Sequence, residues 1–150
     1  MTCREIAASV AERQSRLADE FLFIDEWGDR YQYLIELGKR LPPMPAGLRT
    51  ECNRLPECAG ETFFAGERSD GRLFLHAASD MPVLAGILAL IVEIYSGGEL
   101  AAILRHPPAI FDRTGLTTML SPHRRVALLR IHERLVRLAS DRAAPRRLAS

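Results

Sequence analysis

Apolar and polar residues alternate with a helical period over two stretches in the first third of the chain. In residues 4–24, apolar side chains recur at helical intervals among charges. In residues 28–40, apolar residues share one side and charged residues fall on the other. Prolines 42, 43 and 45 end the second stretch, because proline cannot continue a helix and restricts the residue before it. The pattern therefore predicts two amphipathic helices followed by a short linker.

Two short runs of β-prone residues come next, at 62–65 and 72–76. The residues between them end in Asp70 and Gly71, a pair that favours a tight hairpin turn. We expect the two runs to pair as antiparallel strands. Because both runs contain aromatic or aliphatic side chains, helices should cover at least one face of the sheet.

A third helical pattern runs from Pro82 to Tyr95 and is apolar on nearly all sides, which predicts a central buried helix. Ser79 or Asp80 could cap its start, and the glycines at 97 and 98 should end it. Gly86 lies inside this helix at a cost of about 1 kcal/mol in helix propensity, which suggests a close backbone approach.

The remaining third of the chain contains two further helical segments. A short one is expected at 100–104, before the prolines at 107 and 108. A longer one should begin at Ser121 and Pro122, since a capping serine followed by proline is typical of a helix start. Its apolar residues form one stripe: Leu128, Ile131, Leu135 and Leu138.

A chain of 150 residues is long enough for one domain with its own hydrophobic core. We expect residues 1–14 to form an N-terminal extension that leads into the first helix, and residues 15–140 to form the domain. Residues 141–150 are small and basic and should be disordered.

Composition narrows the function classes. Hydrophobic residues make up 47% and charged residues 26% of the chain, as is ordinary for a globular protein. The formal net charge of +1 gives no electrostatic reason to expect nucleic acid or an anionic membrane as a partner. The longest apolar run, 83–92, is too short to span a bilayer. Three irregularly spaced cysteines favour reduced thiols and a cytoplasmic location over a disulfide framework.

Cys58 is the first candidate for chemistry. It lies between the proline-rich linker and the first predicted strand, and a loop beside a scaffold is where a thiol can meet another molecule. A cysteine that only fills space under a loop would fit the same position. Cys52 could be a resolving thiol or a metal ligand, but an incidental loop cysteine fits its spacing better.

The sequence gives little support for a metal site or for other kinds of catalytic or binding site. The four histidines are not at metal-ligand spacing to one another or to a cysteine, so no metal or cofactor site is expected. Neither a Gly-x-Ser-x-Gly frame nor a glycine-rich phosphate loop occurs. Arg124 and Arg125 are unusual because cations are mildly disfavoured at a helix start. A structural partner, a bound anion or plain exposure to water could each account for them.

Further motifs are spread over about residues 15–139. Around the predicted second helix they include Trp27, Arg30, Gly38 and the sequence Leu41-Pro42. Further along they include Ser79-Asp80, Gly86 and Tyr95, and then Phe111, Gly115-Leu116 and Leu120-Ser121-Pro122-x-Arg124. In kind and in order, these motifs resemble the SufE family of sulfur acceptors. The resemblance implies an α+β fold with a small antiparallel β-sheet flanked by helices, similar to the iron–sulfur scaffold proteins of the NifU type.

The resemblance also implies a role. Proteins of this family accept sulfane sulfur from a pyridoxal-phosphate cysteine desulfurase onto one loop cysteine and relay it for iron–sulfur cluster assembly on a scaffold. They are accessory proteins rather than stand-alone enzymes. Cys58 matches the acceptor position and Arg124 a family arginine on the desulfurase-binding surface. Asp80 and the residues next to the cysteine, Glu57, Ala59 and Gly60, would then contact the partner.

The chain departs from the family beside the cysteine, where Gly-Cys-Gln-Ser is usual. Glu57 replaces the glycine, and a neighbouring carboxylate would raise the pKa of the Cys58 thiol. The polar pair after the cysteine is replaced by Ala59 and Gly60. A second hypothesis follows, in which a diverged binding module regulates a desulfurase or another partner without carrying sulfur. Metal or cluster binding through Cys52, Cys58 and a histidine is a third and weaker one.

Overall fold

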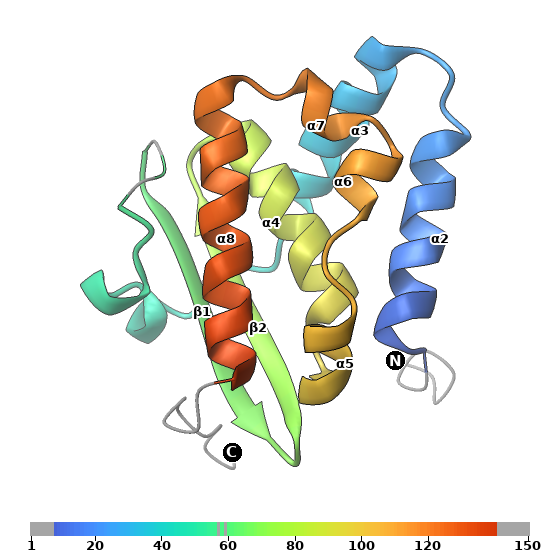
Figure 1. Ribbon diagram of the computed structural model, residues 1–150. Coiled ribbons are helices and arrows are strands. Elements are labelled where there is room, and N and C mark those ends of the chain that lie inside the picture. The colour runs from blue at the N-terminus through green and yellow to red at the C-terminus, as the bar shows by residue number, and fades with distance from the viewer. Residues whose placement is uncertain (1–7, 57, 59, 141–150) are drawn as a thin grey trace.

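A computed structural model describes residues 8–56, 58 and 60–140 of the chain (Figure 1). Helices dominate, and a hairpin lies among them. The elements, in chain order, are α2 (Val10–Leu22), α3 (Trp27–Lys39), the short 3-10 helices η1 (Ala46–Leu48) and η2 (Glu51–Asn53), β1 (Thr62–Ser69), β2 (Arg72–Ser79), α4 (Pro82–Tyr95), β3 (Gly98–Glu99), α5 (Leu100–Arg105), α6 (Ile110–Arg113), α7 (Leu116–Met119) and α8 (Pro122–Ser140).

The sheet confirms the predicted hairpin. Strands β1 and β2 pair antiparallel from Thr62 opposite Ser79 to Ser69 opposite Arg72. The turn consists of Asp70 and Gly71, both with positive φ, as a two-residue hairpin connection requires. Both strands are longer than predicted, because their polar ends still pair across the ladder. β3 adds a short third strand along β2 at glycines that we expected only to end a helix.

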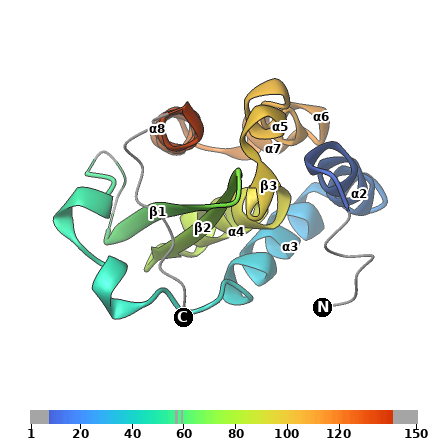
Figure 2. The same cartoon turned by 90° about the horizontal axis from the view of Figure 1, so that it is seen from below.

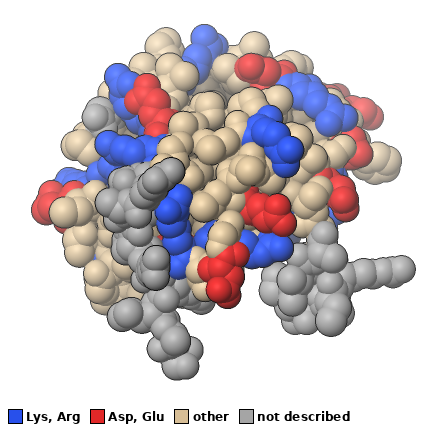
Figure 3. Space-filling view, turned by 60° about the horizontal axis from the view of Figure 1, so that its bottom comes forward, with Lys and Arg blue, Asp and Glu red and all other residues tan. Residues whose placement is uncertain are grey.

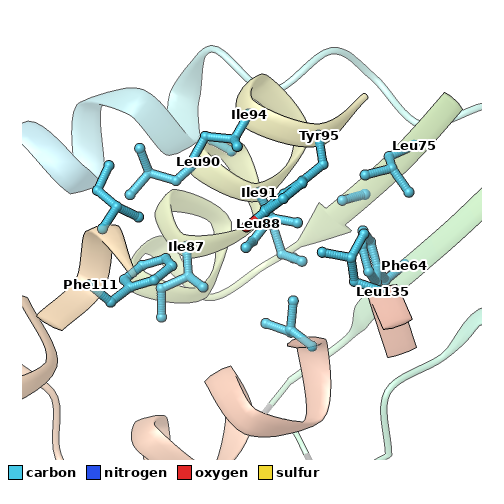
Figure 4. Close-up of a cluster of buried hydrophobic side chains, with 14 of the residues drawn as sticks. Phe64, Leu75, Ile87, Leu88, Leu90, Ile91, Ile94, Tyr95, Phe111 and Leu135 are labelled. Atoms are coloured by element: carbon cyan, nitrogen blue, oxygen red, sulfur yellow. The ribbon is translucent and has the colours of Figure 1, made fainter. Parts of the chain in front are cut away.

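Helix α4 is the centre of the molecule, and its predicted bounds are confirmed. It packs against β2 and against α3 and also contacts α8, and α3 and α8 lie on different sides of it (Figure 2). Ten of its residues are buried, and the close-up in Figure 4 shows several of them among side chains from β1, β2 and α8. The helix is buried on most of its surface, as its sequence predicts.

Two glycines let α3 and α4 cross closely. A Cβ atom built on Gly86 would collide with the backbone carbonyl and side chain of Leu34, and one built on Gly38 would lie 2.7 Å from the amide nitrogen of Gly86. The close backbone approach expected at Gly86 is therefore confirmed, and glycine is required because any other side chain would push the helices apart.

Tyr95 closes the end of this core. Its side chain is fully buried, and its hydroxyl donates a hydrogen bond of 2.6 Å to the carbonyl of His106. Burial raises the pKa of this phenol well above its ordinary value. The hydrogen bond satisfies the one polar atom of a large apolar side chain, which is how buried tyrosines are usually tolerated.

The linker after α3 also packs. Met44 forms a small second apolar cluster with Phe63 and Ala65, on the face of β1 opposite Phe64, and Leu48 packs against it. Strand β1 is thus covered on both faces at its start, by helices on one side and by the linker on the other. This linker also places the next segment, which contains Cys58, against the edge of the sheet.

Helix α8 begins as predicted. Ser121 accepts a hydrogen bond from the backbone nitrogen of Arg124 at 3.3 Å, and Pro122 is the first helical residue. The buried side of the helix is formed by Ala127, Ile131, Leu135 and Ala139. None of the described helices is both long and apolar enough to cross a membrane.

Candidate functional site

The segment around Cys58 is a loop that is closed at its base. The backbone nitrogen of Leu55 donates to the carbonyl of Thr62 at 2.9 Å, and Arg54 forms an isolated β-bridge with Phe63. The loop therefore extends the edge of the sheet beyond β1. Within it, the backbone nitrogen of Cys58 donates to the carbonyl of Leu55 at 3.1 Å. This turn brings the cysteine back over its own base.

The Cys58 side chain is buried. Only 6% of the residue is exposed, and it belongs to the main hydrophobic core together with Leu55. The sequence left open whether this cysteine fills space or meets another molecule, and in this conformation its thiol lies inside. A second macromolecule can reach the thiol only after the loop has moved.

Asp80 holds the far side of the loop. Its carboxylate oxygen Oδ1 accepts a hydrogen bond of 2.9 Å from the backbone nitrogen of Glu61, and its own backbone nitrogen donates to the carbonyl of Glu61 at 3.2 Å. Gly60 has a positive φ of 68°, and a Cβ atom there would collide with the Asp80 carboxylate. Glycine at 60 is thus needed both for its backbone conformation and for the approach of Asp80.

This arrangement corrects the predicted helix cap. Ser79 and Asp80 do not cap α4, whose N-cap is Met81 with no side-chain hydrogen bond. Instead the Ser79 hydroxyl accepts from the backbone nitrogen of Met81 and lies 2.9 Å from the hydroxyl of Thr62. Both polar side chains serve the strand end and the loop, because β2 extends to Ser79 and leaves too little chain to fold back onto α4.

Arg134 fixes the loop base from α8, and no pattern in the sequence had marked it as a candidate. Its guanidinium donates to the carbonyl of Phe64 at 3.2 Å and to the carbonyl of Arg54 at 3.3 Å. It lies between Ile131 and Leu135, which belong to the buried stripe of α8. A cation beside an apolar stripe was the available signal, since such a residue often reaches across to backbone acceptors.

Arg124 has a structural partner. Its guanidinium donates a hydrogen bond of 2.9 Å to the hydroxyl of Tyr31 on α3. It also borders a cavity of about 310 Å³, which is lined by Met81, Leu84, Ser121, His123, Arg124 and Ala127. Met81 follows Asp80 and lies close to Gly60. Met81 therefore borders both the cavity that Arg124 lines and the Gly60 end of the Cys58 loop.

The other candidate residues named from the sequence have different surroundings. Arg125 donates to the carbonyls of Thr117 and Thr118, which explains it without a ligand. Cys52 is exposed on η2, apart from the core that contains Cys58. Within the described ranges, no three histidine, cysteine or acidic residues lie close enough to hold a metal ion. Glu57 and Ala59, both expected to contact a partner, lie outside the described residues.

A second cavity, of about 470 Å³, lies farther along α8 than Arg124 and borders the loop base. Two of its lining residues come from the loop segment and four from α8: Leu55, Pro56, Arg130, Glu133, Arg134 and Arg137. We call it the arginine groove. It could not be identified from the sequence, because the arginines are spread over α8 and meet the loop only in the folded chain.

Comparisons with known proteins found a matching family model and several similar proteins. Residues 15–139 match the family model described as SufE, Fe-S metabolism associated domain. A SufE-like protein of Rhizobium meliloti is 39% identical over 114 residues, covering 73% of this chain and 81% of the relative. The sulfur acceptor protein CsdE of Escherichia coli is 27% identical over 122 residues, covering 80% and 83%.

One solved structure shows the same fold. The solution structure of a hypothetical protein from Thermus thermophilus has a TM-score of 0.72 and 24% sequence identity, and the match covers 85% of this chain and 93% of that one. The predicted α+β fold with a small antiparallel sheet flanked by helices is confirmed.

Proposed function

Because this chain belongs to the SufE family, we propose that it accepts sulfane sulfur from a cysteine desulfurase on Cys58 and relays it for iron–sulfur cluster assembly. The observation that carries the proposal is the loop itself. A cysteine lies in a closed loop whose base is tied to β1 and whose far side is held by Asp80. Such a loop exposes its thiol when it opens and buries the thiol again when it closes.

The transfer is a thiol–persulfide exchange that needs no external oxidant or reductant. The Cys58 thiolate attacks the outer sulfur of the desulfurase persulfide and forms a new sulfur–sulfur bond. The bond between that sulfur and the desulfurase cysteine breaks, and the desulfurase cysteine leaves as a thiolate. Cys58 then carries the persulfide, and the desulfurase is free for another turnover in the cytoplasm.

Burial of Cys58 gives this mechanism two states. With the loop closed, the thiol or persulfide lies in the core, away from competing thiols in solution. With the loop open, the sulfur can meet the donor or the iron–sulfur scaffold. Opening would take place at the far side of the loop, where Asp80 makes two hydrogen bonds with Glu61, one of them through its side chain. The backbone hydrogen bonds at the loop base can stay in place, so that opening need not disturb α4 or the sheet.

Arg124 and Asp80 would contact the desulfurase. Both adjoin Met81, which follows Asp80 in sequence and lines the smaller cavity together with Arg124. Glu57, Ala59 and Gly60 flank the cysteine in sequence and would enter the same interface once the loop is open. No metal ion or organic cofactor of this chain takes part in the step.

A second candidate is a binding module that regulates the desulfurase without carrying sulfur. It is favoured by the buried Cys58 thiol and by Glu57, whose carboxylate adjoins the cysteine in sequence. Such a module would need its docking surface but not its thiol.

Turnover of a desulfurase separates the two candidates. Alanine release is measured with the intact protein, with Cys58→Ser and with Cys52→Ser as a matched control at the exposed cysteine. We expect the intact protein and Cys52→Ser to stimulate turnover equally and Cys58→Ser to give no stimulation. Equal stimulation by Cys58→Ser would favour the binding module and overturn the sulfur-acceptor role.

A further inference from the structure

The arginine groove lies directly beside the Cys58 loop. Leu55 and Pro56 form its loop wall, three and two positions before the cysteine, and α8 supplies the opposite wall. Its arginines are 130, 134 and 137, which follow each other at helical spacing and therefore share one flank of α8. Among the lining residues that the structure describes, Glu133 is the one carboxylate. The groove thus places three cations against one anion next to the proposed site of sulfur transfer.

Each arginine of the groove is held differently. Arg134 is fixed by the carbonyls of Phe64 and Arg54. Arg130 donates to both carboxylate oxygens of Glu133 at 2.9 Å, in a pair whose side chains are 42% and 63% exposed. Such an exposed ion pair is weak and can be exchanged for another carboxylate. Arg137 is exposed, so its guanidinium can turn toward an incoming anion.

The chemistry of the lining favours carboxylates on a polypeptide. Arginine binds a carboxylate through two parallel hydrogen bonds, and Leu55 and Pro56 offer an apolar wall to the side chains between them. A nucleic acid fits poorly, because Glu133 interrupts the positive charge of the groove and the chain carries only +1 overall. On the face shown in Figure 3, basic and acidic side chains are likewise interspersed.

We propose that the arginine groove docks an acidic segment of the protein that delivers sulfur to Cys58. The inference rests on the proposed function and adds a second contact to it, farther along α8 than Arg124. The groove is open in the same conformation in which Cys58 is buried. The donor protein can therefore bind in the groove before the loop moves and exposes the thiol. This order lets the acceptor recognise its donor before the thiol becomes accessible.

The test is the rate of sulfur uptake by the full chain from a cysteine desulfurase, followed by intact mass. The variant Arg130→Glu/Arg137→Glu reverses two charges of the groove and leaves Arg134 in place. The matched control, Arg16→Glu/Arg105→Glu, makes the same change of net charge at exposed residues of α2 and α5. A small alkyl persulfide without carboxylates serves as a second donor that has no acidic segment.

We expect the groove variant to take up sulfur from the desulfurase roughly tenfold more slowly at low salt, with the difference shrinking as salt is raised. The control variant should match the intact protein, and all three should react equally with the small persulfide. Equal rates from the desulfurase for the groove variant and the control would overturn the docking proposal while leaving the acceptor role intact. No uptake by the intact protein from either donor would overturn both.

A labelled peptide of consecutive glutamates identifies the class of ligand. Its fluorescence anisotropy is titrated against the intact protein and the groove variant, with single-stranded DNA of the same length as the competing probe. Binding of the peptide that is lost in the groove variant supports the proposal. Groove-dependent binding of the DNA but not of the peptide would overturn it.

Discussion

Two glycines mark two differently built regions of this molecule. A side chain at Gly86 would strike the backbone of Leu34, where α3 and α4 cross, whereas a side chain at Gly60 would strike the carboxylate of Asp80, where the Cys58 loop meets β2. At the crossing, backbone packs against backbone and nothing can give way. At the loop, the obstacle is a side chain that can rotate. The crossing is therefore permanent, and the loop contact can be broken and remade.

The helix crossing is also held by more stabilising free energy than the loop contact. Helix α4 is buried over most of its length and is stabilised by the whole core. The loop is held by individual hydrogen bonds, each worth about 0.5–1.5 kcal/mol net. Opening such a segment costs less than unfolding the domain. A buried thiol in this loop is thus compatible with transfer, whereas a buried thiol on α4 would not be.

The largest effect is expected at the crossing. Gly86→Ala should lower the free energy of unfolding by about 2 kcal/mol, because the added methyl group meets backbone that cannot move aside. For a chain of this size that corresponds to a fall in Tm of about 4–8 °C. Gly28→Ala on α3 is the control, since a Cβ atom there has open space. Calorimetry showing equal Tm values for the two variants would refute the close crossing.

The next effect concerns Tyr95 at the end of the same core. Tyr95→Phe should lower the free energy of unfolding by about 1 kcal/mol at neutral pH, because the partly buried carbonyl of His106 loses its donor. Burial raises the pKa of Tyr95 in the folded chain above the ordinary value of about 10. The protonated phenol therefore contributes stability that is fully present below pH ~10 and is lost as the pH rises toward the folded pKa.

Urea unfolding between pH 9 and 11 would measure this loss (roughly the range around the ordinary tyrosine pKa). The intact protein should lose up to about 1.4 kcal/mol per pH unit through Tyr95 above the ordinary pKa, and Tyr95→Phe should lack that part. Tyr33→Phe is the comparison: partial burial and a hydrogen bond to Glu20 raise the pKa of Tyr33 as well, but this side chain lies nearer the surface. If the free energy of unfolding fell equally steeply with pH in the intact protein and in Tyr95→Phe, the account would be contradicted.

The smallest effect on the stability of the whole domain is expected at Asp80. A substitution there should nevertheless change the reactivity of the Cys58 thiol. Asp80→Ala removes the acceptor for the backbone nitrogen of Glu61, which should cost the closed loop about 1 kcal/mol. The reactivity of the Cys58 thiol toward a disulfide reagent should then rise about fivefold, with little change in Tm. Cys3→Ser/Cys52→Ser serves as the background for both proteins, so that Cys58 is the cysteine left to react with the reagent. Unchanged reactivity would mean that Asp80 does not hold the loop closed.

The periodic parts of the fold could be predicted from the sequence, and the irregular parts could not. The bounds of α4, the start of α8 and the hairpin followed from hydrophobic spacing and turn residues. Helices α6 and α7 are four residues each and were missed, because so short a segment has no period. The third strand, β3, forms by pairing with β2, which is distant in sequence. The local sequence pattern therefore does not predict it.

The candidate site shows the same division. Most motif residues behind the family resemblance prove to be structural: Arg30 donates to the carbonyls of Ile24 and Thr114, and Gly38 and Gly86 permit the helix crossing. They identified the fold and, through it, the position of Cys58. The roles of Asp80 and Arg134 could not be predicted, because both depend on backbone groups that only the tertiary fold brings near.

The central claim is that Cys58, despite its burial, is the residue that receives sulfur. The direct measurement is the intact mass of the protein after incubation with a cysteine desulfurase and cysteine, followed by alkylation and peptide mapping. We predict a gain of one sulfur atom on Cys58, retained in Cys52→Ser and abolished in Cys58→Ser. No gain in the intact protein, or a gain that persists in Cys58→Ser, would contradict the account.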